Sequence, residues 1–201
     1  IYTCAEDSMA RRSAQTALFH IAEAFVRWIA PILSFTAHEI WSFMPGDRTE
    51  SVFVAEWYPL ERLNEGEGIN QNDWASILLV KEAINKVIES ERNQGVIKGS
   101  LGANVCLYAE PEMYASLAKL GEELRFVTIT SKAELRPIAE ANNVAESTLS
   151  GLRVSLERSS SDKCVRCWHF IEDVGSQLTH PDVCARCVDN ISGQGEVRAH
   201  A

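Results

Sequence analysis

The sequence predicts a protein of several domains, mainly α-helical at first and α+β later, that ends in a four-cysteine zinc-binding module. Apolar residues recur with helical spacing over the first hundred residues, strand-like segments follow residue 100, and two Cys-x-x-Cys pairs lie near the C-terminus. We therefore expect an antiparallel helical bundle over residues 1–100, a small three-stranded α+β unit over 101–158 and a zinc-binding module over 159–201.

Composition and charge are those of an ordinary soluble globular protein. The chain is 46% hydrophobic and 23% charged, with no apolar run long enough for a membrane helix. We expect a cytoplasmic protein without a membrane partner. The net charge of −9 argues against a protein that coats nucleic acids through its overall field. An RNA contact would therefore depend on locally placed arginines.

Two helices are expected before residue 50, separated at Pro31, which breaks the helical hydrogen-bond pattern. The expected buried stripe of the first helix is Leu18, Ile21, Phe25, Trp28, Ile29 and Ile32. The second helix runs from Ile32 to Met44. His20, Glu23 and Arg27 share the opposite face of the first helix. A solvated face explains that stripe more simply than a ligand contact.

A third helix is expected after the polar loop "NEGEGINQND" (64–73). Asp73 is its expected N-cap, and its end is expected near Gly95. Its expected buried stripe is Trp74, Ile77, Leu78, Ile84, Val87 and Ile88. The segment "SVFVAEWYP" (51–59) is expected to be an extended connector. Three antiparallel helices of this length form a bundle.

The pattern of apolar residues changes after residue 100, from helical spacing to short strand-like segments. "ANVCLYAE" (103–110), "AELRPIA" (133–139) and "GLRVSLERS" (151–159) predict three short strands. One or two short helices, beginning at a proline, are expected over 111–129. We expect a three-stranded sheet with helices on one face, followed by a polar hinge at "SSSDK" (159–163).

The two cysteine pairs lie in "KCVRCWHF" (163–170) and "CARC" (184–187), a spacing that matches a four-cysteine zinc site. Two residues between ligands let a tight turn aim both sulfurs at one ion, and backbone N–H groups can donate to the thiolates. A second such turn completes the closed tetrahedron of a structural zinc. We expect one zinc ion bound by Cys164, Cys167, Cys184 and Cys187. Lys163, Arg166 and Arg186 would offset the negative charge of the thiolates.

Two disulfides or a redox dithiol are the alternatives. Disulfides need an oxidising compartment, and no secretory segment is visible. A redox motif would normally lie at a βα junction and would not occur in pairs. His169 and His180 could replace a cysteine ligand, but four thiolates already fill the shell. Cys4 and Cys106 are left as free thiols.

Trp168 follows a cysteine of the first pair in a module with little core to bury it. Its indole could pack against the cysteine turns, or it could stack on an unpaired RNA base. Arg166 lies in the same turn and could reach a phosphate or a base edge. No Ser/His/Asp or Cys/His constellation has a supporting context, so the residues themselves indicate no active site.

The cysteine motifs and the tail occur in a distinctive order. Cys-x-Arg-Cys-Trp at 164–168 is followed by Cys-x-Arg-Cys-Val at 184–188, an asparagine, and Gly-x-Gly-Glu at 193–196. This order resembles the C-terminal end of bacterial isoleucyl-tRNA synthetases. Residues 7–41 and 52–59 resemble the helical anticodon-binding domain of that family, and residues 85–110 resemble its continuation. The resemblance covers essentially the whole chain.

This resemblance implies a C-terminal fragment, cut at its N-terminal side, of a class I synthetase that joins isoleucine to its tRNA using ATP. The family's HIGH and KMSKS motifs, which bind ATP, and its editing domain are missing from these 201 residues. The fragment is therefore expected to be non-catalytic. Its implied partners are the anticodon stem-loop of isoleucine tRNA and the rest of the synthetase chain, which would act as a monomer. The family's tRNA contacts correspond to Arg166 and Trp168.

Two other functions stay open. A DNA-repair glycosylase has a similar terminal zinc finger, although its N-terminal catalytic residues and helical organisation are not seen here. A zinc-stapled protein-interaction module would instead make Trp168 a hot spot for a protein partner. Valyl and leucyl synthetases share the helical bundle, but the paired cysteine motifs point away from them. Binding to tRNA, to duplex DNA or to neither would separate the three functions.

Overall fold

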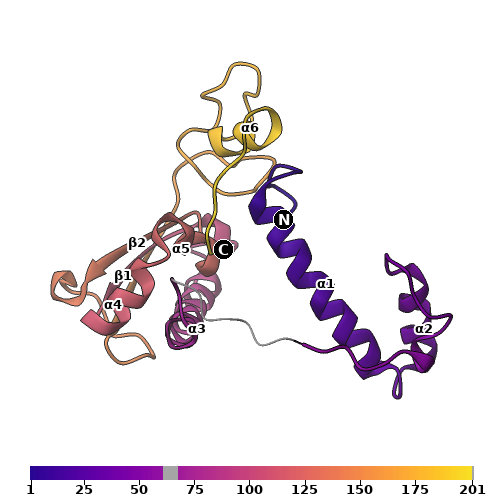
Figure 1. Ribbon diagram of the computed structural model, residues 1–201. Helices are drawn as coiled ribbons and strands as arrows, with labels where there is room; N and C mark the ends of the chain where they lie inside the picture. The colour runs from indigo at the N-terminus through magenta and orange to yellow at the C-terminus, as the bar shows by residue number, and fades with distance from the viewer. Residues whose placement is uncertain (61–67, 201) are drawn as a thin grey trace. The chain divides into compact units, whose positions relative to one another are not determined.

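The computed structural model describes residues 1–60 and 68–200, so the first part of the polar loop expected at 64–73 lies outside the described residues. The chain divides into two compact units (Figure 1). The first comprises Met9–Asn64 together with Ile1, and the second comprises Tyr2–Ser8 and Glu65–Ala201. Among the helices that the structure describes, none combines the length and apolar character needed to cross a membrane.

The first unit contains the helices α1 (Met9–Ile29) and α2 (Ser34–Phe43). The expected break at Pro31 is confirmed, because α1 ends two residues before the proline, which cannot donate a backbone hydrogen bond. The expected extended connector at 51–59 is wrong in part, since Val52–Val54 forms a short 3₁₀ turn. The hydroxyl of Ser51 caps this turn by accepting from the N–H of Phe53.

The buried face of α1 is not the expected apolar stripe. Leu18, Ile21 and Phe25 are each more than half exposed, whereas Glu23 and Val26 are buried. The core of this unit consists of Val26, Ala30, Ala37, Trp41 and Val52, with Ile29 packed against it. Ala30 and Ala37 are buried in this core, so the two helices meet along a side with small residues and not along the stripe of large apolar ones. Of the expected stripe, Ile29 contributes to this core.

Glu23 is buried because two arginines reach its carboxylate. Arg27 donates to Oε2 at 2.6 Å, and Arg48 donates to Oε1. Both guanidinium groups also lie over the Trp41 ring, at 4.6 and 4.7 Å from its centroid. Burial raises the pKa of Glu23, but the hydrogen bonds from Arg48 and Arg27 outweigh it and the net shift is downward. The solvated-face explanation of the His20–Glu23–Arg27 stripe is therefore wrong for Glu23.

The second unit contains a three-stranded sheet of β1 (Ala103–Ala109), β2 (Lys132–Pro137) and β3 (Leu152–Arg158), as expected. The strand order is β2-β1-β3, with β1 parallel to β2 and antiparallel to β3. Leu107 in the central strand lies opposite Leu135 on one side and Val154 on the other. The helices that share a core with this sheet are α3 (Gln71–Asn93), α4 (Pro111–Ala118) and α5 (Leu124–Thr128).

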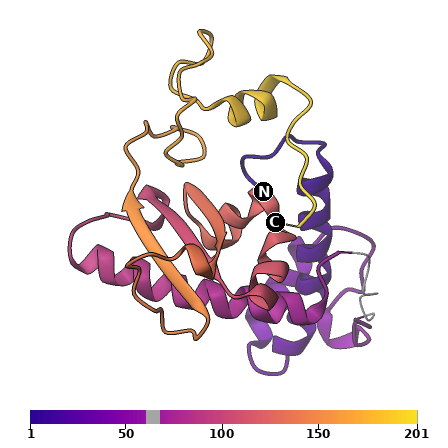
Figure 2. The same ribbon diagram turned by 90° about the vertical axis from the view of Figure 1, so that its left-hand side faces the viewer.

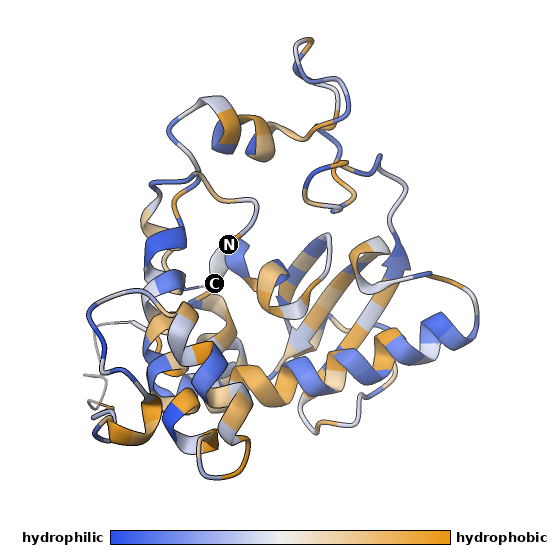
Figure 3. Cartoon of the chain, turned by 90° about the vertical axis from the view of Figure 1, so that its right-hand side faces the viewer, coloured by the Kyte–Doolittle hydropathy of each residue, from blue (hydrophilic) through white to orange (hydrophobic). Residues whose placement is uncertain are grey.

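One face of the sheet carries the core, which confirms helices on a single face. Alternate residues of β1, from Ala103 to Ala109, are buried, while those between them are partly exposed. The buried set packs with residues of α3, α4 and α5, such as Ile84, Leu117 and Leu124. Figure 2 shows α3 running alongside the sheet. In Figure 3, hydrophobic and hydrophilic patches alternate along α3, as expected of a helix with one buried side.

Helix α3 packs against the sheet, which differs from the packing that its sequence predicted. Its amphipathic pattern predicted a bundle with the first two helices, but its buried residues Ile77, Val80 and Ile84 share a core with the strands. Ile77 and Ile84 of the expected stripe are buried, whereas Leu78 is 57% exposed. Periodicity predicted the helix and most of its buried side. The partner was decided by strands that come later in the chain.

The ends of α3 have well-formed caps. Asn70, not Asp73, is the N-cap: its side chain accepts from the Asp73 N–H, while the Asp73 carboxylate accepts from the Asn70 N–H. At the other end, Gly95 has φ +78 and its N–H donates to the backbone carbonyl of Arg92. The N–H of Val96 donates to the backbone carbonyl of Glu91, which completes a Schellman motif. The expected end near Gly95 is confirmed.

Candidate metal centre and nucleic-acid interface

The four cysteines predicted as ligands lie together. Their sulfurs are all within 4.8 Å of one another, and those of Cys167 and Cys184 are 3.8 Å apart. A tetrahedron with Zn–S bonds of about 2.3 Å places neighbouring sulfurs about 3.8 Å apart, whereas disulfide sulfurs are separated by about 2.05 Å. All six cysteines have free thiols. The donor set fits a zinc ion and does not fit the disulfide alternative.

Two backbone turns bring the sulfurs together. In the first cysteine turn (164–168), the N–H of Trp168 donates to the carbonyl of Cys164 at 2.9 Å. In the second, Cys184 is the N-cap of α6 (Ala185–Ser192), so Cys187 lies in the first turn of that helix. A helix N-terminus favours a negatively charged sulfur. The N–H of Cys184 also approaches the Cys164 sulfur at 3.4 Å, a backbone donor of the kind that the spacing predicted.

Four clustered thiols cannot all ionise without a cation. Hydrogen bonds from Cys184 and Cys187 lower the pKa of Cys167, because they stabilise its thiolate. The interaction with Cys167 in turn raises the pKa of Cys184 to about 11, and it raises that of Cys187 as well. A bound dication removes this repulsion, since it stabilises every thiolate at once. The electrostatics of the cluster therefore also fit a metal site.

The indole of Trp168 points away from the protein core. It is 60% exposed, and its backbone has φ +67, in the left-handed region that favours glycine. A non-glycine residue held there costs about 1–3 kcal/mol. The Lys163 ammonium lies 4.9 Å from the ring centroid. More than half of the Trp168 surface is therefore open to solvent, and the rest packs beside Lys163 and the first cysteine turn.

Comparisons with known proteins agree with this arrangement. Residues 1–107 match the family described as the anticodon-binding domain of tRNA ligase. The chain belongs to this family. Residues 161–190, which include all four clustered cysteines, match a zinc finger found in FPG and IleRS. The zinc-finger match and the cluster together support a structural zinc ion in this anticodon-binding family member.

Similar proteins extend over the full chain. An isoleucine–tRNA ligase of Teredinibacter turnerae is 54% identical over 202 aligned residues, which cover 100% of this chain and 22% of that protein. The ligases of Pseudomonas paraeruginosa and Azotobacter vinelandii are 52% and 50% identical, and 21% of each is covered. The chain therefore spans about a fifth of the length of the curated relatives that it matches.

The three cations expected to offset the thiolate charge, Lys163, Arg166 and Arg186, make different contacts. The Arg186 guanidinium lies 3.9 Å from the Cys187 sulfur, as predicted. Arg166 instead donates to the carbonyl of Thr3 at 3.3 Å and is partly buried, while Lys163 lies over the Trp168 ring. Arg166, the second predicted RNA contact, thus has part of its hydrogen-bonding capacity used within the protein.

An arginine cluster that the sequence pattern did not predict joins the zinc module to α5 and to the C-terminal tail. Glu196 accepts from Arg186 at 2.6 Å and from Arg198 at 3.0 Å. The guanidinium groups of Arg125, Arg186 and Arg198 surround the Phe126 ring. Burial raises the pKa of Glu196, but Arg198 and Arg186 lower it by more. The Gly-x-Gly-Glu motif at 193–196 was the sequence signal that could have predicted this cluster, because it places a carboxylate, Glu196, shortly after Arg186 of the second cysteine turn.

His169 and His180 lie outside the sulfur cluster. His169 is buried, its Nδ1 is 3.1 Å from the carbonyl oxygen of Cys167, and its ring meets Phe126 edge-on. Through the Cys167 carbonyl oxygen, His169 contacts the backbone of the first cysteine turn. Nδ1 of His180 contacts the hydroxyl of Thr179 instead. Neither ring belongs to the metal-ligating group found in the described residues.

Proposed function

We propose that this chain is the tRNA-binding part of an isoleucine–tRNA ligase, an enzyme that attaches isoleucine to its tRNA using ATP. The partner would be the anticodon stem-loop of isoleucine tRNA. The isoleucine-activating and ATP-binding steps would take place in parts of the ligase outside these 201 residues. Support comes from the anticodon-binding family match over residues 1–107 and from the names of the relatives. A monomeric, cytoplasmic ligase is part of the same proposal.

The domain limits remain those expected from the sequence: 1–100 for anticodon binding, 101–158 for the junction and 159–201 for the zinc module. The family match to residues 1–107 supports the first limit. Because α3 shares its core with the sheet, the first two domains would be functional divisions and not separately folding ones. Removing residues 101–158 would expose the buried side of α3.

The metal would be one structural zinc ion per chain, held by Cys164, Cys167, Cys184 and Cys187. Its chemistry is to hold four thiolates in a tetrahedron and so to fix the two cysteine turns. The module around it has few large buried side chains, so folding and metal binding should be coupled. Elemental analysis should find one zinc per chain. A zinc-free, folded module would contradict the proposal.

The observation that carries the RNA-binding proposal is the exposed indole of Trp168, held in a strained conformation on a metal-fixed turn. An aromatic side chain presented from a fixed backbone can stack on an unpaired base with less loss of backbone freedom on binding. Stacking one base contributes about 1–3 kcal/mol. Arg166 would contribute through the N–H groups that its contact with Thr3 leaves available. Binding energy gathered at the anticodon can help to place the distant acceptor end for reaction.

The test replaces Trp168 in the complete ligase. Trp168→Ala should keep the zinc and weaken the binding of isoleucine tRNA by about 1–3 kcal/mol, and Trp168→Phe should recover part of the loss. Trp168→Gly should lose the same binding while stabilising the turn, because glycine accepts the left-handed backbone. Val165→Ala is the control, since Val165 lies in the same turn and is 59% exposed. Normal tRNA binding by Trp168→Ala and Trp168→Gly would contradict the proposal.

The alternatives predict other outcomes. A DNA-repair role would require tighter binding to duplex DNA than to tRNA, and the match of residues 1–107 to an anticodon-binding family gives it no support. A protein-interaction module would bind neither nucleic acid. Titrating the same ligase with isoleucine tRNA, an anticodon-swapped tRNA and duplex DNA separates these outcomes.

A further inference from the structure

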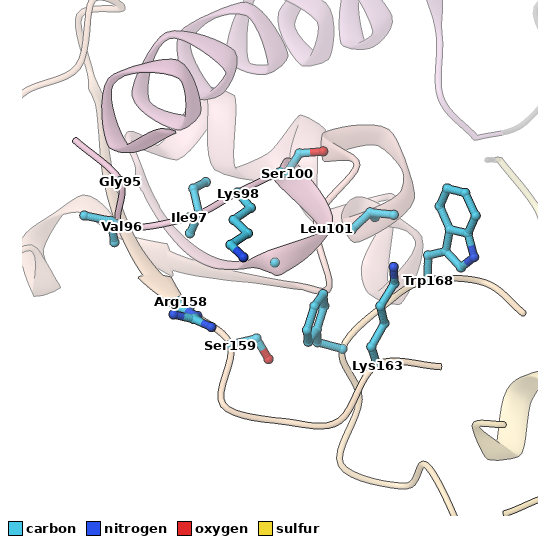
Figure 4. A pocket seen from close by; sticks show the side chains of 13 residues that line it. Gly95, Val96, Ile97, Lys98, Ser100, Leu101, Arg158, Ser159, Lys163 and Trp168 are labelled. Atoms are coloured by element: carbon cyan, nitrogen blue, oxygen red, sulfur yellow. The ribbon is translucent and has the colours of Figure 1, made fainter. Parts of the chain in front are cut away.

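A groove of about 470 Å³ lies beside Trp168 in the second unit (Figure 4). It is bounded by the loop that follows α3, by the end of β3 and by the first cysteine turn. Among its 13 lining residues are three cations, Lys98, Arg158 and Lys163, and no carboxylate. Leu101 and Phe170 supply apolar surface between them. In a chain with a net charge of −9, this local excess of positive charge is unusual.

Two cations of the groove, Lys98 and Arg158, are available to an external anion, and the third, Lys163, lies over the Trp168 ring. Lys98 and Arg158 are exposed, and within residues 1–60 and 68–200 the ion pairs include neither of them nor Lys163. Exposed basic residues elsewhere in the second unit, on strand β2, already have carboxylate partners. Lys132 and Arg136 both pair with Glu134 there, at 2.6 and 2.9 Å. A phosphate entering the groove would therefore meet positive charges that no carboxylate already neutralises.

The backbone that presents these cations is held at several points. The Schellman motif at Gly95 fixes the start of the loop, and Ile97 anchors it in the core with 3% of its surface exposed. The N–H of Ser159, next to Arg158, donates to the carbonyl of Gly102 at 2.9 Å. The N–H of Phe170 donates to the Ser131 hydroxyl at 2.6 Å. Charges held on a fixed backbone bind an extended anion with less loss of conformational freedom.

We propose that this groove binds the sugar–phosphate backbone of single-stranded RNA that continues from the base stacked on Trp168. The inference rests on the proposed function and names a further binding site for it. A stacking aromatic next to cations that no carboxylate of the described residues neutralises matches the combination found in single-strand binding sites, a positively charged groove with aromatic side chains for the bases. Phosphates would lie against Lys98 and Arg158, Lys163 would add positive charge beside the stacked base, and the apolar surface of Leu101 and Phe170 would face a ribose or a base.

The test measures tRNA affinity against salt concentration in the complete ligase. Lys98→Gln and Arg158→Gln should each reduce the slope of log affinity against log salt by about 0.7, the value for one phosphate contact on a single strand. The double variant should reduce it by about twice as much. Lys86→Gln is the matched control, because Lys86 is an exposed lysine of the same unit that already pairs with Glu82. It should leave the slope unchanged.

The outcomes separate the groove from the proposed function. If Trp168→Ala weakens tRNA binding while Lys98→Gln and Arg158→Gln leave the salt slope unchanged, the groove proposal is overturned and the proposed function stands. If Trp168→Ala also has no effect, both fail. A single-stranded RNA with the anticodon-loop sequence, used as a competitor, should bind the double variant more weakly than the wild type. An equal loss for a duplex RNA competitor would overturn the assignment to single strands.

Discussion

Helices α1 and α3 are both amphipathic by sequence and of nearly equal length, 21 and 23 residues, yet they use their apolar residues differently. Helix α3 buries Ile77 and Ile84 against the sheet. Helix α1 leaves Leu18 and Phe25 about half exposed and buries Glu23. Helical spacing therefore identifies a helix reliably, but the buried side depends on which partner supplies a complementary surface.

The two helices also differ in what stabilises them. The interior side of α3 gains from the removal of aliphatic surface from water, at roughly 25 cal/mol per Å². The interior side of α1 combines small residues with a carboxylate that two arginines and the Trp41 ring enclose. Such a network stabilises only while every member keeps its charge and its geometry. We therefore expect α1 to respond to charge and pH, and α3 to respond to side-chain volume.

The largest effect is expected in the core under α3. Ile84→Ala should lower the free energy of unfolding by about 2–5 kcal/mol, because it removes a fully buried side chain and leaves a cavity. Leu78→Ala on the exposed side of the same helix should change it by less than about 0.5 kcal/mol. Urea denaturation of both variants measures the contrast. Similar losses for both would mean that α3 is buried on two sides.

Glu23→Gln should destabilise the first unit by about 1.5–3 kcal/mol, the range for hydrogen bonds to charged groups, and leave two guanidinium groups without their carboxylate. Glu82→Gln provides the control, since Glu82 forms an exposed i,i+4 pair with Lys86 that should contribute little. Thermal and urea unfolding of the two variants gives the comparison. A silent Glu23→Gln would show that burial of the carboxylate offsets all that its partners contribute.

Acid should reproduce part of the Glu23 effect. The pKa of Glu23 in the folded protein lies below its ordinary value of 4.5, so its contribution is fully present above pH 4.5. The contribution is lost as pH falls through the folded pKa. The difference in unfolding free energy between wild type and Glu23→Gln should therefore shrink as the solution is acidified below pH 4.5. A difference that grows on acidification would reverse the sign of the pKa shift.

The smallest effect is expected at the exposed stripe of α1. Phe25→Ala should change the free energy of unfolding by less than about 0.5 kcal/mol, despite the size of the side chain, because about half of its surface remains in water. Val26→Ala, one residue along, removes fewer atoms but should cost more, since Val26 is 1% exposed. If Phe25→Ala proves the more harmful of the two, the expected stripe is buried in solution after all.

Features that depend on residues close in sequence were predictable from the sequence. The helix break at Pro31, the end of α3 at Gly95 and the three strands follow from local backbone chemistry and from alternation. The cysteine cluster was predictable for the same reason. Each Cys-x-x-Cys pair forms its own turn, so only the meeting of two turns had to be inferred.

Features that depend on distant residues were decided by the tertiary structure. Arg166 turns toward Thr3, 163 positions away, and Glu196 gathers arginines around Phe126 on another helix. Trp168 has a left-handed backbone and an exposed indole because its N–H closes the first cysteine turn. The buried side of α1 includes Glu23 because Arg48, from beyond α2, reaches its carboxylate. Spacing along the chain determines which residues share a turn or a helix face. Which of those faces meets another depends on contacts between distant segments, and a repeating pattern does not encode those contacts.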